Sequence, residues 1–431
     1  MDTNSLLRKL EPLIPDKVRN WRRTRDTADP ETNSLIDRAI AEAAYQLLGD
    51  FREKILLSLP PENRSKGAIN LGTVVYDKPR WPFGISTGEL LQNLAIFGRS
   101  GAGKTNVVFH LIQQLTDRNI PWLFWDWKRT ARHLIPKIKG RVKVLTPGRS
   151  LSSLSFNPFI VPPGMEANVY ITQLVDIMAS AFTLGDGARS VLQKAIAACY
   201  RDGVEAPSID EIKMELGKLP DNNRSTGWKT SAMRALDSIA FANVAGTTRS
   251  SQEETARSLL QSQTIIELDA LADSTKQFLI PVLSLWLYAA KLSSVDREQL
   301  TLVIVIEEAH HVLYRSEQRS RESVMNRLLR QCREIGIGIV VVDQHPHLIS
   351  SAALGNTYTS ICLNLKDPSD INRAAALSQV ADDEKSCFSR LPVGYGVIKM
   401  QDRWRRPLLT RFPLIDVAKG AVTDDLLKQI I

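Results

Sequence analysis

Apolar residues recur at two different spacings along the 431-residue chain, and the change of spacing divides it. In the first 58 residues the apolar positions have helical spacing, as in SLIDRAIAEAAYQLLGDFREKILLSL, and the pattern ends at the break PPENRSKG. From Gly67 onward, short runs that are apolar throughout alternate with helical segments. Such runs are typical of strands covered on both faces. The pattern predicts a helical N-terminal region, residues 1–67, followed by an α/β domain.

Strands that alternate with helices indicate a mostly parallel sheet flanked by helices. The apolar runs predict strands at 94–97, 122–126, 142–146, 264–268, 302–307, 337–343 and 360–365. Between the third and fourth strands the periodicity is helical, and Ser208 with Glu211 forms a capping-box pattern. The predicted organisation is a core of residues 68–164 and 263–412, a mostly helical insert at 165–262, and a C-terminal tail at 413–431.

The segment GRSGAGKT follows the predicted strand 94–97 and precedes a helical pattern, which is the context of a phosphate-binding P-loop. Its glycines let successive backbone N–H groups point inward, and the helix N-terminus favours anions. We expect Lys104 to reach the terminal phosphates of ATP, and the Thr105 hydroxyl to bind Mg²⁺. No guanine-reading N-K-x-D motif is present, since NLKD at 364–367 has another order. The predicted nucleotide-binding residues are Gly98, Arg99, Ser100, Gly101, Ala102, Gly103, Lys104, Thr105 and Asn106.

The apolar run LVIVI leads directly into two glutamates, Glu307 and Glu308. Acids at the carboxyl end of a core strand suit a magnesium shell and the polarisation of an attacking water. We assign Glu307 to the Mg²⁺ shell and Glu308 to the water. Gln344 ends another strand and can sense the terminal phosphate or orient the water, while Asp126 can add an outer contact.

Arg327, Arg330 and Arg333 repeat every three residues on a predicted helix, and one of them can act as an arginine finger toward a neighbouring subunit. A solvated basic face is the alternative reading of this spacing. The histidine pairs in HH (310–311) and HPH (345–347) raise the question of a transition-metal site. Both pairs follow strands whose ends carry the nucleotide chemistry, so hydrogen bonding to backbone or phosphate is favoured over a dedicated metal site.

The composition of the chain adds expectations about its binding partner and its cellular compartment. The formal charge is +8 and the isoelectric point is near 9.3, which favours a polyanionic partner such as nucleic acid. The four cysteines have no spacing typical of metal knuckles or redox pairs, which favours free thiols. No transmembrane segment is predicted, because the apolar stretch FLIPVLSLWLYAA is too short to span a bilayer. We therefore expect a cytoplasmic protein.

With these residues in place, the chain resembles the HerA/FtsK superfamily of ring ATPases, especially HerA-like motors and conjugative-transfer ATPases. The resemblance covers roughly residues 82–399 and rests on GRSGAGKT, WLFWDWK, SFNPF, LVIVIEEAHHVL, CREIGIGIVVVDQHP and LPVGYGVIK. It implies a RecA-like core, a homo-hexameric ring, and ATP hydrolysis at subunit interfaces. The catalytic residues that it implies are Lys104, Asp126, Glu308 and Gln344, with Arg333 acting in trans.

The resemblance also implies that the ring threads double-stranded DNA and works with a partner nuclease or effector. Candidate DNA contacts are Arg315, Arg319 and Arg321, in the basic segment YRSEQRSRES. HerA proper has an N-terminal β-barrel that helps to dock its nuclease, whereas residues 1–67 here are predicted to be helical. Two alternatives follow: an ATP-dependent scaffold that gates an anti-phage effector, and a peripheral ATPase of a conjugation or secretion machine.

Overall fold

The structure is a computed structural model that describes residues 3–51, 53–220, 225–241, 248–292, 298–314, 322–418 and 420–430. The chain forms two compact units. Unit 1 comprises Met1–Ser86, Ile96–Val107 and Thr359–Leu414, and unit 2 comprises Thr87–Ala95, Val108–Tyr358 and Ile415–Ile431. The division passes through β3 (Leu94–Phe97), so both units contain parts of the predicted ATPase core.

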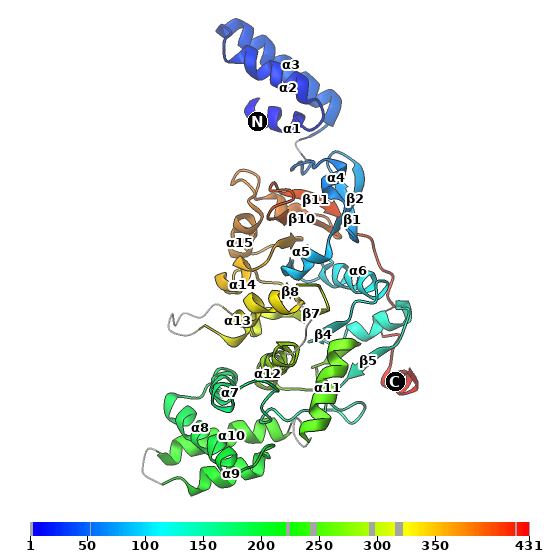
Figure 1. Cartoon of the computed structure of the whole chain (residues 1–431). Helices are drawn as coiled ribbons and strands as arrows, with labels where there is room; N and C mark the ends of the chain where they lie inside the picture. Colours follow the sequence, from blue (N-terminus) through cyan, green and yellow to red (C-terminus); the bar gives the residue numbers. More distant parts are fainter. Residues whose placement is uncertain are drawn as a thin grey trace. The chain divides into compact units, whose positions relative to one another are not determined.

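Unit 1 begins with the predicted helical region, which is confirmed as α1 (Thr3–Leu10), α2 (Pro15–Arg25), α3 (Pro30–Leu48) and the short α4 (Glu62–Ser65) (Figure 1). Asp29 caps α3 by accepting hydrogen bonds from two backbone N–H groups, and prolines begin α2 and α3. The helices share an apolar core, which includes Tyr76 from the turn after β1. Its buried residues are Leu6, Leu7, Leu10, Val18, Ile40, Ala44, Leu48, Leu56 and Tyr76.

The strands of unit 1 pair antiparallel, in the order β2-β1-β11-β10-β9. Their bounds are β1 (Ile69–Val75), β2 (Pro79–Ile85), β9 (Thr359–Cys362), β10 (Tyr395–Met400) and β11 (Leu408–Arg411). The sequence pattern predicted no strand at 69–85 or at 395–411, and the strand predicted at 360–365 ends at Cys362. Prolines 79 and 82 are tolerated because β2 is the outermost strand. Unit 1 also holds α15 (Pro368–Ser378) and α16 (Cys387–Arg390).

The strands of unit 2 pair in parallel, in the order β8-β7-β4-β6-β5, as the continuous apolar runs predicted. Their bounds are β4 (Trp122–Asp126), β5 (Val142–Leu145), β6 (Gln263–Glu267), β7 (Leu302–Glu307) and β8 (Ile337–Asp343). All residues of β4, β7 and β8 are buried. Because these three neighbours are parallel, Asp126, Glu307 and Asp343 end at the same edge. The predicted α/β class is confirmed.

Helices flank and extend this sheet. They are α5 (Thr87–Leu91), α6 (Lys104–Thr116), η1 (Ala131–Lys137), α7 (Ala167–Ala181), α8 (Asp186–Arg201), α9 (Ile209–Lys218), α10 (Ser225–Phe241), α11 (Arg249–Gln261), α12 (Asp273–Leu292), η2 (Ala309–His311), α13 (Val324–Gln331), η3 (Cys332–Ile335), α14 (Ser351–Gly355) and α17 (Asp424–Ile430). Helices α7 to α11 lie between β5 and β6, which confirms the helical insert. Four of them, α7 to α10, pack together as the green group in Figure 1. The capping box of Ser208 and Glu211 is formed at the start of α9.

The four cysteines are buried as free thiols. Among the described residues, no helix has both the length and the apolar character that crossing a bilayer requires.

Candidate active site

The P-loop runs from the end of β3 to the start of α6, within unit 1. Gly101 and Gly103 have φ angles of 77° and 107°, a left-handed region that glycine adopts without strain. Lys104 is the first residue of α6, and its Nζ donates hydrogen bonds to the carbonyls of Gly98 (2.6 Å) and Arg99 (3.2 Å). The lysine ammonium therefore lies against the loop that is predicted to hold the phosphates.

The other predicted nucleotide-binding residues lie on the same loop and on the first turn of α6. Ser100 is exposed, Ala102 is buried, and Thr105 and Asn106 are half-buried. The Asn106 amide donates a hydrogen bond of 2.6 Å to the carbonyl of Pro413. The N-terminal end of α6 presents backbone N–H groups, which favour a bound phosphate.

Asn364 supports the P-loop, and the sequence analysis did not assign it a role. The Arg99 side chain donates from Nε to Asn364 Oδ1 (2.6 Å), and the Arg99 backbone N–H donates to the Asn364 carbonyl (2.8 Å). The Asn364 amide donates in turn to the carbonyls of Ser389 (3.0 Å) and Leu391 (2.8 Å). Asn364 belongs to the NLKD segment, which was considered only as a guanine-reading motif.

In unit 2, Glu307 and Glu308 lie at the carboxyl end of β7. Glu307 is the last strand residue and is 8% exposed. Glu308 has φ 48° and ψ 45°, so the backbone turns into the left-handed region there and the strand ends. This conformation is uncommon for a residue with a side chain, and such residues tend to cluster at functional sites.

The Glu308 carboxylate receives two donors on one oxygen. Gln344 Nε2 donates to Oε1 at 2.8 Å, and Lys128 Nζ forms an ion pair with the same oxygen at 2.5 Å. Burial raises the pKa of the Glu308 carboxyl, but the hydrogen bonds from Lys128 and Gln344 outweigh burial, and the net pKa is lowered. The carboxylate thus stays charged at neutral pH. The structure brings together the predicted Glu308 and Gln344, and adds Lys128, which the sequence analysis did not assign.

Asp126 ends β4, and its side chain organises its own loop. One carboxylate oxygen accepts the backbone N–H of Lys128 (3.1 Å), and the other accepts that of Ala131 (2.7 Å). The residue is fully buried, and this burial raises the pKa of Asp126 to about 6. These contacts shape the segment that carries Lys128, so the structure links Asp126 to Glu308 through that loop.

The histidines after β7 make structural contacts. The His310 backbone N–H (2.6 Å) and ring Nδ1 (2.9 Å) both contact Asp343 Oδ2, and this hydrogen bond raises the pKa of His310. The His311 ring stacks on Trp127, with ring centroids 4.4 Å apart. Potential ligand atoms of Glu308, His310 and Asp343 lie within 4.8 Å of one another. Because Asp343 Oδ2 already accepts two hydrogen bonds, these contacts favour the hydrogen-bonding role over a metal site.

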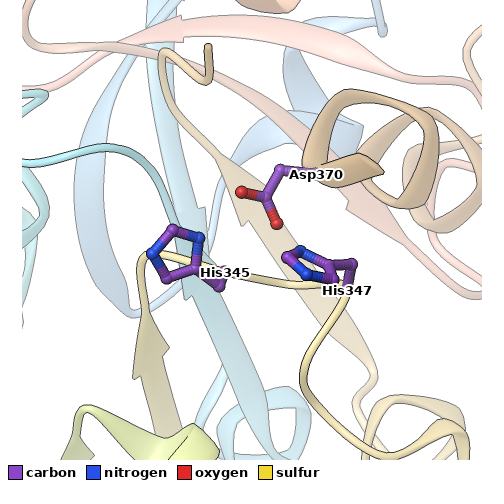
Figure 2. A group of neighbouring side chains, drawn as sticks. All are labelled: His345, His347 and Asp370. Carbon is purple, nitrogen blue, oxygen red and sulfur yellow. The ribbon is translucent and has the colours of Figure 1, made fainter. Parts of the chain in front are cut away.

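His345 and His347 lie on the segment after β8, within unit 2, and Figure 2 labels both side chains. Their ring centroids are 5.9 Å apart in an edge arrangement. The His345 backbone N–H donates to Asp343 Oδ1 at 2.8 Å. Asp343 therefore fixes the start of this segment as well as the loop after β7.

The predicted arginines differ in their surroundings. Arg327 and Arg330 lie on α13, whereas Arg333 lies on the following 3-10 helix η3 and is exposed. The continuous helix expected for all three ends at Gln331. Arg330 pairs with Glu322 at 3.0 Å.

The proposed DNA contacts Arg315, Arg319 and Arg321 lie outside the described residues.

This arrangement agrees with a family assignment. Residues 69–285 match the family described as "Helicase HerA, central domain". The chain belongs to this family. Because it carries the complete P-loop motif of the family's ATPase core, it is a P-loop ATPase.

Two relatives are named DNA double-strand break repair helicase HerA. The protein of Sulfurisphaera tokodaii is 22% identical over 359 residues, which cover 78% of this chain and 67% of that protein. The protein of Saccharolobus solfataricus is 22% identical over 350 residues, covering 77% and 66%. The chain thus spans about two thirds of the length of these relatives.

Solved structures show the same fold at lower identity. The bacterial conjugative coupling protein TrwB aligns with a TM-score of 0.59 and 11% identity, over 83% of this chain and 92% of that one. VirB4 of Thermoanaerobacter pseudethanolicus aligns with a TM-score of 0.60 and 14% identity, over 80% and 96%. These likenesses confirm the RecA-like fold.

Proposed function

We propose that the chain hydrolyses ATP as a hexameric ring and uses the energy to translocate double-stranded DNA, together with a partner nuclease or effector. One observation carries this proposal: Gln344 donates to Glu308 at 2.8 Å, at the carboxyl ends of the neighbouring parallel strands β8 and β7, in a chain of the HerA family. A polar amide against a carboxylate at that edge is suited to orient an attacking water.

The proposed roles follow from the chemistry of each side chain. The P-loop N–H groups and Lys104 bind the phosphates of ATP. The Thr105 hydroxyl and the Glu307 carboxylate offer the oxygen donors that Mg²⁺ prefers, and Glu307 lies buried at the strand end. Bound Mg²⁺ supplies charge neutralisation at the phosphates. Glu308 accepts the proton of the water, and Gln344 holds that carboxylate in place.

The proposed DNA binding rests on the net charge of the chain, and the proposed ring rests on the exposure of Arg333. The formal charge of +8 favours binding to a phosphate backbone. Arg333 is exposed, as a residue that acts on a neighbouring subunit must be. The helices α1 to α3, with their own apolar core, offer a surface for the partner protein.

The test measures ATP turnover with and without duplex DNA at low salt. We expect duplex DNA to stimulate turnover, and Lys104→Ala and Glu308→Gln each to lower it roughly 10²-fold or more. Particle mass, measured with an ATP analogue and DNA, should correspond to six chains. Unstimulated turnover without DNA binding would argue for an ATP-dependent scaffold that gates an effector, and a strict monomer would exclude the ring.

A further inference from the structure

Lys128 contacts the proposed catalytic glutamate from the loop after β4, and the sequence analysis gave this lysine no role. It lies two residues beyond Asp126, and its Nζ reaches Glu308 Oε1, 180 positions further along the chain. The side chain of Lys128 is 53% exposed, whereas that of Glu308 is 12% exposed. The lysine side chain therefore lies partly in solvent and is not part of the apolar core.

The loop that carries Lys128 is held on both sides. The Asp126 carboxylate accepts the backbone N–H groups of Lys128 and Ala131. Between them, the buried Trp127 ring stacks parallel to His311, with 4° between the ring planes. The backbone from which the lysine extends is thus fixed against the residues that follow β7.

The two oxygens of Glu308 have different surroundings. Oε1 accepts from both Lys128 and Gln344, whereas Oε2 lies 3.8 Å from His310 Nδ1. A carboxylate held by one oxygen cannot rotate freely, and its second oxygen keeps a fixed direction. A proton acceptor must be held in this way within hydrogen-bond reach of the water.

We propose that Lys128 is a positioning residue for ATP hydrolysis: it holds Oε1 of Glu308 so that Oε2 accepts the proton of the attacking water. This inference rests on the proposed role of Glu308. Lys128 does not touch the water in this scheme. Gln344 alone leaves the carboxylate with one neutral donor, which is a weaker anchor.

The test compares Lys128→Met, Lys128→Arg and the matched control Lys139→Met, which removes an exposed lysine from the same β4–β5 connection. We expect Lys128→Met to lower kcat by about 10- to 100-fold, with KM and the affinity for a fluorescent ATP analogue unchanged. Lys128→Arg should restore most of kcat, because a guanidinium can reach the same oxygen. Lys139→Met should behave as the unchanged protein.

The double variant separates positioning from direct chemistry. If Lys128 acts through Glu308, then Lys128→Met combined with Glu308→Gln hydrolyses ATP no more slowly than Glu308→Gln alone. An additional loss in the double variant, or a kcat for Lys128→Met equal to or above that of the unchanged protein, overturns the inference. Full turnover in Glu308→Gln would instead refute the assignment of Glu308, and with it the inference. The unfolding midpoint of each variant, compared with that of the unchanged protein, checks that the variant folds. If Lys128→Met has a clearly lower midpoint, Lys128→Gln takes its place in the test.

Discussion

His310 and Asp343 form the contact that ties the loop after β7 to the end of β8. Asp343 is fully buried, and its Oδ2 accepts from both the backbone N–H and the ring of His310. A buried carboxylate favours the imidazolium form, so the pKa of His310 is raised. At the residue scale, this contact makes the stability of the site depend on pH.

We expect the free energy of unfolding to contain a contribution from His310 that depends on pH. Because the pKa of His310 is raised in the folded state, the contribution is full below the unfolded value of about 6.5 and is lost as the pH rises through the folded pKa. Urea unfolding should therefore show that the free energy of unfolding falls between about pH 6 and about pH 9. This fall should be larger for the unchanged protein than for His310→Gln.

His133 provides the control of opposite sign. Burial lowers the pKa of His133, so its contribution to stability grows as the pH rises. His133→Gln should therefore change the pH dependence in the direction opposite to His310→Gln. Equal pH dependence in the unchanged protein and in His310→Gln would show that the contact with Asp343 does not favour the imidazolium.

A second prediction at this scale concerns Asn364. Asn364→Ala removes the acceptor for Arg99 Nε and the donor to two carbonyls, and Asn364 itself is 8% exposed. We expect a loss of about 1–3 kcal/mol in stability and weaker ATP binding, since the P-loop loses its support. Calorimetry with an ATP analogue and chemical unfolding measure both effects. The matched control Asn356→Ala removes an amide outside the P-loop, and wild-type ATP affinity in Asn364→Ala would contradict the prediction.

The residues that the sequence predicted differ in kind from those it missed. Lys104, Glu308 and Gln344 stand at the ends of apolar runs or inside a short motif, so their neighbours in sequence identify them. Lys128 and Asn364 act through partners that are 180 and 265 residues away in the chain. Their roles depend on which loops the fold brings together, and no local pattern carries that information.

The same distinction holds for the elements. The bounds of β4, β7 and β8 match the predicted runs, because strands covered on both faces are apolar throughout. The strands β1 and β2 were missed because glycine and proline interrupt INLGTVV and PRWPFGI, and because antiparallel outer strands tolerate polar positions. The apolar signal is thus strongest for the strands that end at the acids proposed to act in catalysis.

The third prediction concerns α17, a helix of unit 2 whose first residue, Asp424, contacts three arginines of the same unit. Asp424 Oδ1 accepts from Arg129 (2.7 Å) and Arg132 (2.6 Å), and Oδ2 from Arg149 (3.4 Å). We expect Asp424→Asn to speed amide hydrogen exchange throughout α17, because the charged contacts hold it in place. The change in global stability should stay below about 1 kcal/mol, since the Asp424 side chain is 41% exposed.

Asp425 is the matched control for this element. It lies next to Asp424 on α17, and its carboxylate pairs with Lys428 on the same helix at 3.5 Å. Asp425→Asn should leave the exchange of α17 unchanged. If both variants exchange alike, the arginines do not hold the helix.

At the scale of the whole molecule, the proposed site residues are divided between the two units. The P-loop belongs to unit 1, whereas Glu307, Glu308, Gln344 and Arg333 belong to unit 2. In the proposed ring a further division arises, because the proposal assigns Arg333 of one subunit to the nucleotide of another.

The last prediction tests that division by complementation. Arg333→Ala alone and Lys104→Ala alone should each hydrolyse ATP poorly, since the first lacks the finger and the second lacks the phosphate-binding lysine. When both variants are co-expressed in one ring, a subunit that lacks Arg333 can receive the finger of a neighbour that lacks Lys104. Random assembly at equal amounts makes about a quarter of the sites complete, and turnover should recover accordingly. Arg330→Ala, which removes an arginine already paired with Glu322, should keep its turnover without a partner variant. Inactive mixed rings would show that Arg333 does not act between subunits. A subunit whose own site cannot hydrolyse ATP can supply only an arginine that acts on a neighbouring site.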